Sequence, residues 1–148
     1  MADDFYLVKI GTVTLSTDGT DGGAACLTKV DNLDQLFGGW IGVTRIPLSG
    51  DPFNFVAQNE GKNVKIITKP FVVSQTVLDS LKTLINTAAQ LNSVIEVSIS
   101  NGPGSVNVDC KPFWEGEKLP IGFSSNFNNP NLYDVEIRLI SVGYTAAP

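Results

Sequence analysis

The 148-residue sequence contains no histidine. Histidine is the side chain that most often moves protons near neutral pH, and it is the commonest metal ligand. Its absence excludes the Ser-His and Cys-His pairs of nucleophilic enzymes and every metal site built on imidazole. Neither Gly-x-Ser-x-Gly nor Ser-x-x-Lys occurs in the chain. We therefore predict that the protein is not an enzyme and has no catalytic residue.

Charged residues are also scarce, at 17% of the chain against 43% hydrophobic residues. Soluble domains average roughly 25% charged residues, so this protein has few charges to spread over its surface. A surface that is short of charge indicates that partner proteins cover part of it. An ordinary monomer whose surface is wetted by Asn, Thr, Ser and Gly remains the alternative.

Basic residues are fewer than acidic ones, and the net charge is -5. This balance excludes tight binding to nucleic-acid phosphates, which requires clustered Lys and Arg. The opening "MADDFYLVKI" lacks the basic start of a secretory signal, and no apolar run approaches the about 20 residues of a membrane helix. We expect folding in a cytoplasm, with Cys26 and Cys110 reduced and inert, although a disulfide between them remains open.

Hydrophobic periodicity predicts one helix among several strands within a single domain, residues 1–148. The helix is expected at about 74–90, with Ser74 as its N-cap and an apolar stripe that includes Leu78, Leu81 and Ile85. Strands are expected over 5–15 with a bend at Gly11, over 40–47, as a short edge strand within 49–61, and over 62–70, 93–100, 105–114 and 132–144.

The connections between these strands are mostly too short for parallel crossovers. The stretch "NGPG" at 101–104 lies between two alternating segments, which is a strong hairpin signal. The predicted fold class is α+β, mainly antiparallel β: a β-sandwich or partly open β-barrel with one flanking helix.

Of all segments, "LSTDGTDGGAAC" looks most like a ligand-binding loop, but the spacing of its acidic residues does not match a metal-binding motif. A calcium loop of the EF-hand type needs oxygen ligands at positions 1, 3 and 5 and a Glu at position 12, and neither Asp18 nor Asp21 starts such a register. "EGKN" and "NGPGSVN" likewise lack parts of the phosphate-binding motifs. We therefore predict no metal, no cofactor and a mobile loop.

The stretch "PFWEGEK" places Glu115 and Glu117 beside Trp114. Two carboxylates next to an aromatic ring could serve a sugar-binding site or a hydrolase. Adjacent acids at the end of a strand are more commonly solvated. Trp40, Phe53, Phe55 and Trp114 are therefore predicted to fill the core or an interface.

The chain resembles the structural proteins of bacteriophage tails, namely the tail-tube, distal-tail and baseplate ring subunits. The resemblance is carried by "STDGTDGG", by the strand and helix "KNVKIITKPFVVSQTVLDSLKTLINTA", by the hairpin "VIEVSISNGPGSVNVDCKPF" and by the closing strand "YDVEIRLISV". It covers about 62–142 best, and no short diagnostic motif supports it.

This resemblance implies a subunit of the virion tail, assembled in the host cytoplasm as a homo-oligomeric ring, often a hexamer. Its partners would be further copies and other tail proteins, with DNA as passing cargo and no membrane. The loop after the first strand would reach a neighbouring subunit; its residues are Asp18, Gly19, Thr20, Asp21, Gly22 and Gly23. The alternative is a soluble β-rich module that binds a carbohydrate or small ligand through Trp40 and Trp114. A hydrolase using Glu115 or Glu117 is a weaker third hypothesis.

Overall fold

The computed structural model describes residues 5–15, 25–28, 36–37, 40–58, 61–101, 104–128 and 130–145, without the side chains of Trp40, Ile41 and Gln58. In chain order the elements are β1 (Tyr6–Ile10), β2 (Val13–Thr14), β3 (Trp40–Arg45), β4 (Phe53–Gln58), β5 (Lys62–Ile67), β6 (Phe71–Ser74), α1 (Gln75–Leu91), β7 (Ile95–Ser100), β8 (Ser105–Pro112), β9 (Ile121–Ser125) and β10 (Leu132–Tyr144).

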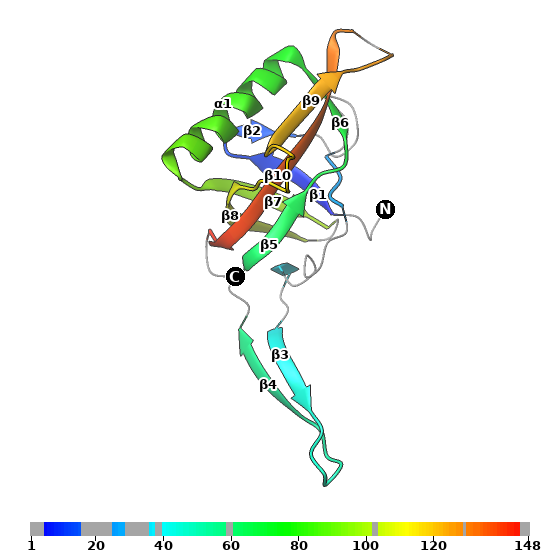
Figure 1. The fold of residues 1–148 in the computed structure, drawn as a ribbon, viewed down its shortest axis with the longest axis vertical. Coiled ribbons are helices and arrows are strands. Elements are labelled where there is room, and N and C mark those ends of the chain that lie inside the picture. Colours follow the sequence, from blue (N-terminus) through cyan, green and yellow to red (C-terminus); the bar gives the residue numbers. More distant parts are fainter. Residues whose placement is uncertain are drawn as a thin grey trace.

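The main sheet follows the order β2-β1-β7-β8-β10-β5, and its strand pairs are antiparallel. The N-terminal half of β10 pairs instead with β6 and β9. The sheet curls around the core, and α1 packs against it (Figure 1). The predicted fold class, a partly open barrel with one flanking helix, is confirmed.

The segment 25–28 connects two strands that lie far apart in the sheet order. On one side Leu7 N–H donates to Ala25 C=O over 2.8 Å. On the other side Thr28 N–H donates to Ile67 C=O, also over 2.8 Å. Because these bonds join β1 to β5, they close the curled sheet at one end.

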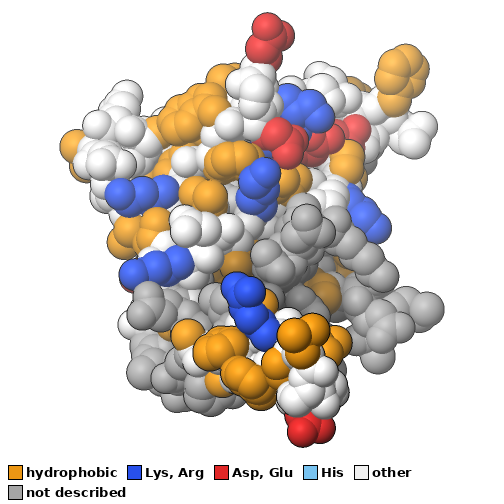
Figure 2. Space-filling view, turned by 60° about the horizontal axis from the view of Figure 1, so that its bottom comes forward, with side chains coloured by type: hydrophobic (Ala, Val, Ile, Leu, Met, Phe, Trp, Pro, Cys, Tyr) orange, Lys and Arg blue, Asp and Glu red, His pale blue; other side chains and the backbone are white. Residues whose placement is uncertain are grey.

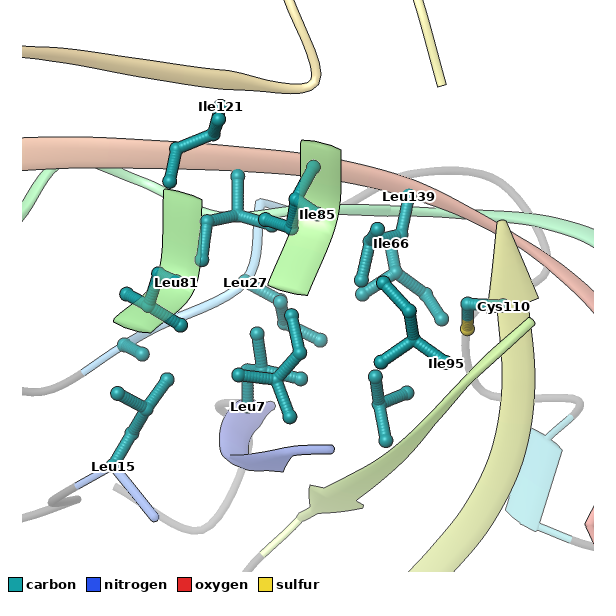
Figure 3. Packing of buried hydrophobic residues seen from close by; sticks show 14 of the residues in the cluster. Leu7, Leu15, Leu27, Ile66, Leu81, Ile85, Ile95, Cys110, Ile121 and Leu139 are labelled. Carbon is teal, nitrogen blue, oxygen red and sulfur yellow. The ribbon is translucent and has the colours of Figure 1, made fainter. Parts of the chain in front are cut away.

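The core lies between α1 and the curled sheet. Leu78, Leu81, Ile85 and Ala88 are the buried residues of α1, and their spacing is that of one helix face. Figure 3 shows Leu81 and Ile85 beside buried side chains of the sheet and of segment 25–28, including Leu7, Leu27 and Ile66.

The helix confirms the prediction, with one correction at each end. It runs one residue further than expected, and Asn92 ends it in the left-handed conformation with its N–H donating to Ala88 C=O. Ser74 occupies the N-cap position, but its side chain makes no capping hydrogen bond. Ser74 is the last residue of β6, paired with Leu132 of β10, so strand and helix meet without a loop.

The predicted first strand, 5–15, is a tight hairpin in the structure. Lys9 pairs with Thr14 and Ile10 with Val13, so the chain reverses where only a bend was expected. Gly11 makes the reversal possible because its φ is +57°, which other residues rarely adopt. A Cβ atom at Gly11 would also lie 2.8 Å from Cδ1 of Leu84, so the turn packs directly under α1.

The hydroxyl of Thr68 accepts a hydrogen bond from a backbone amide of β10. Its side chain is 2% exposed, and its Oγ1 accepts a hydrogen bond of 2.8 Å from Ile137 N–H. Thr68 N–H also donates to Ile137 C=O over 3.0 Å. Thr68 thus fastens the junction between β5 and β6 to the central strand.

We predict that Thr68→Val lowers the free energy of unfolding by about 1–3 kcal/mol, because the shape is kept while the buried N–H of Ile137 loses its acceptor. Urea unfolding followed by circular dichroism measures the change. The matched control Thr14→Val, at an exposed strand position, should change stability by less than about 0.5 kcal/mol. Equal stability of the two variants would contradict this role for Thr68.

Candidate assembly surface

Strands β3 and β4 form a two-stranded sheet of their own. They pair with each other from Trp40↔Gln58 to Arg45↔Phe53, and within the described chain neither pairs with a further strand. Figure 1 shows this hairpin extending away from the barrel, at the opposite end of the molecule from α1 and β2. The hairpin is therefore an arm attached to the barrel.

The two faces of the hairpin differ in character. Directly paired residues, and residues two apart in a strand, lie on the same face of a sheet. Val43, Arg45, Phe53 and Phe55 therefore share one face, where the two phenylalanine rings lie 5.2 Å apart. The opposite face is mixed: Val56 is 60% exposed there, and Thr44 Oγ1 donates to Oδ1 of Asn54 over 2.6 Å.

The apolar face, defined here as Val43, Phe53 and Phe55, is not covered by the described chain. These side chains are 56%, 53% and 56% exposed, respectively. Beyond them, the tip adds the exposed Ile46 and Leu48. Figure 2, in which the hairpin end comes forward, shows hydrophobic side chains gathered there. Contiguous apolar exposure of this kind marks an interaction site.

Gly42 allows the two strands of the arm to approach each other. A Cβ atom at this position would lie 2.4 Å from the carbonyl oxygen of Phe55 and 2.8 Å from Cγ1 of Val56. Real Cβ atoms do not approach so closely, so any other residue would push the strands apart.

The barrel holds both segments that lead into and out of the arm through Tyr144, the last residue of β10. Its hydroxyl donates to Leu36 C=O over 3.1 Å, ahead of β3. After β4, a Cβ atom on Gly61 would lie 3.2 Å from Cε2 of Tyr144, so glycine packs closely on that ring. Partial burial raises the pKa of Tyr144, which keeps its hydroxyl protonated as a donor.

The predicted interface residues fall into three groups. Phe53 and Phe55 lie together on the arm. Trp114, 52% exposed, lies in the connection between β8 and β9. Trp40 lies in β3 with its side chain outside the described part, and Asp18 to Gly23 lie wholly outside it.

Sequence reasoning missed the contribution of Val43, Ile46 and Leu48. The signal was present, because Val43 and Arg45 alternate with Gly42 and Thr44, as Phe53 and Phe55 do with Asn54, on either side of the turn residues "PLSGDP". In the structure Gly50 N–H donates to Pro47 C=O over 2.9 Å within this turn.

The two carboxylates of "PFWEGEK" have different surroundings. Glu117 is exposed, whereas Oε1 of Glu115 lies 3.8 Å from Nε of Arg138. Arg138 also binds Oε2 of Glu136 through Nη2 at 2.6 Å and donates from Nη1 to Leu119 C=O at 2.9 Å. Glu115 thus belongs to an ion cluster that fastens the β8–β9 connection to β10.

Arg138 is buried although its side chain is charged. It alternates along β10 with the apolar Ile137 and Leu139, yet it is only 5% exposed. The β8–β9 connection covers it, and Arg138 N–H donates to Pro120 C=O over 2.7 Å.

The two cysteines are free thiols and form no disulfide. Burial raises the pKa of Cys110, and the nearby negative charge of Asp109 raises it to a smaller extent. This thiol therefore stays protonated and unreactive. Within the described ranges, no group of three His, Cys, Asp or Glu residues gathers as metal ligands would. The helix present in those ranges is neither long nor apolar enough to cross a membrane.

Comparison with known protein families, with curated proteins and with solved structures found no match to this chain.

We predict that Arg138→Met lowers the free energy of unfolding by about 1–3 kcal/mol, because it removes the charge-assisted hydrogen bond to Leu119 C=O and the ion pair with Glu115 that hold the β8–β9 connection. Lys118→Met, an exposed cation in the same connection, is the matched control and should stay within about 0.5 kcal/mol of the parent. Chemical denaturation of the three proteins makes the comparison. An Arg138→Met protein as stable as the control would show that the cluster does not fasten the connection.

Proposed function

We propose that the protein is a non-enzymatic structural subunit of a bacteriophage tail, of the tail-tube, distal-tail or baseplate ring type, which self-assembles into a ring around a DNA channel. One observation carries the proposal: the β3–β4 arm exposes an apolar face that the described chain does not cover. An isolated two-stranded hairpin is at best marginally stable in water, so a partner surface would stabilise the arm. The resemblance of the sequence to tail structural proteins is the reason for placing the subunit in a phage tail.

The energy of assembly would come from covering the arm. Burying a Val or Phe side chain fully contributes about 1.5–3 kcal/mol, and half of that surface is already covered for each residue of the apolar face. Each side chain would thus add about 1 kcal/mol. A closed ring repeats every contact once per subunit, so modest contacts combine into a stable particle.

The charge of the protein also suits this function. A net charge of -5 would keep a DNA channel from attracting phosphates, so that DNA passes as cargo and is not bound. Further copies of the chain and other tail proteins would be the partners. The subunit would assemble in the host cytoplasm and reside in the virion tail. A role for Asp18 to Gly23 in contacting a neighbouring subunit stays a prediction.

We predict that the purified protein forms rings or tubes, and that Phe53→Ser combined with Phe55→Ser raises the concentration needed for assembly about tenfold or more. The factor follows from losing about 1 kcal/mol at each position. Sedimentation velocity over a dilution series measures the concentration, and negative-stain microscopy shows the particles.

Asn54→Ser is the matched control, since it changes a neighbouring polar residue on the opposite face of the same strand. It should assemble like the parent protein. A parent protein that stays monomeric at all concentrations, or a double variant that assembles as the parent does, would contradict the proposal.

A further inference from the structure

A groove lies on the barrel beside α1, far from the arm. Its volume is about 650 Å³, and its walls come from α1, from the β1–β2 turn and from the start of β7. Leu84, Ala88 and Val94 supply apolar surface, and Thr83 and Thr87 add hydroxyls. Pockets of about 300–1,000 Å³ hold drug-sized ligands, so this groove has room for several side chains.

The groove and the apolar face of the arm carry complementary charges, and the acid of the arm, Asp51, lies in the turn before β4. Asp79 and Glu96 line the groove, and no Lys or Arg does. Gln75 Nε2 donates to Oδ1 of Asp79 over 2.9 Å, which leaves the second oxygen of that carboxylate available. On the arm, Arg45 shares the apolar face with Phe53, and no carboxylate of the described chain pairs with it.

Exposed aromatic residues elsewhere on the barrel fit the arm less well. Phe123 lies in β9, and Trp114 lies in the β8–β9 connection. The ammonium of Lys82 lies 4.7 Å from the ring centre of Phe123, and that of Lys65 lies 5.3 Å from the ring centre of Phe113. These cations would repel Arg45, whereas the groove would attract it.

The arm cannot fill the groove of its own chain. Its root is fixed at Tyr144, and Figure 1 shows α1 and β2 at the opposite end of the molecule from the arm. An arm and a groove on separate faces of one subunit make a head-to-tail contact between copies. Such contacts generate rings when the rotation closes and filaments when it does not.

We propose that the apolar face of the β3–β4 arm of one subunit docks in the α1–β2 groove of a second copy of this chain, with Arg45 facing Asp79 and Glu96. This inference rests on the proposed self-assembly and names the surface that receives the arm. It also gives the half-exposed Val94 and the exposed Leu91 beside the groove a partner.

A cross-linking experiment tests the contact in the full-length protein with Cys26→Ser as background. A Val43→Cys protein is mixed with a Thr87→Cys protein, and a short bismaleimide is added. The expected result is a heterodimer that appears at the same concentrations as the assembly.

Two matched controls accompany the cross-linking experiment. Thr44→Cys replaces Val43→Cys on the opposite face of the arm, and Ser125→Cys replaces Thr87→Cys at an exposed site on β9. Either control should reduce the yield at least about fivefold. Equal yields from the test pair and the controls would overturn the inference.

Charge exchange tests the same contact without cross-linking. Arg45→Glu and Glu96→Arg should each raise the concentration needed for assembly about tenfold, because each places like charges together. The two changes in one chain should restore assembly to within about threefold of the parent, as expected for residues in contact. The absence of any restoration would contradict the contact, and melting curves verify that each variant is folded.

The outcomes separate the two proposals. A parent protein that never assembles removes both. Assembly that requires Phe53 and Phe55, but that is unchanged by Glu96→Arg and gives no more cross-link between the Val43→Cys and Thr87→Cys proteins than the controls do, leaves the ring in place and eliminates the groove as its docking site.

Discussion

Four strands pair with β10, and the architecture depends on that pairing. Its N-terminal half holds β6 and β9, and its C-terminal half holds β5 and β8. Two buried hydroxyls add hydrogen bonds to this pairing: Ser141 of β10 accepts from Val64 N–H of β5, and Thr68 accepts from Ile137 N–H of β10. Tyr144, at its end, then fixes the root of the arm. The strand that organises the core therefore also positions the surface that we propose for assembly.

Barrel and arm differ in how they are stabilised. The barrel buries a continuous apolar cluster under α1 and is closed at one end by segment 25–28. The arm has cross-strand pairs, but none of the residues that the structure describes forms a layer over its apolar face, and a two-stranded sheet gains little stability from such pairs alone. We therefore expect the contact with a second subunit to stabilise the arm. A chain with few charged residues is consistent with a surface that other subunits cover.

Local signals predicted much of the fold. The helix followed from its apolar stripe, and the β7–β8 hairpin followed from "NGPG". The reversal at Gly11 was read as a bend, because sequence does not distinguish a bent strand from a tight turn packed under Leu84. The β3–β4 hairpin was missed as a pair, since its turn holds two prolines and no Asn-Gly. Burial of Arg138 depends on a distant connection folding over it, which alternation within one strand cannot reveal.

Hydrogen exchange at several protein concentrations tests the central claim most directly. If a second copy covers the arm, amide protection across residues 40–58 should rise with concentration, while protection of the barrel strands stays constant. Exchange in the arm that is equally fast or equally slow at every concentration would contradict the claim, because the arm would then be indifferent to other copies of the chain.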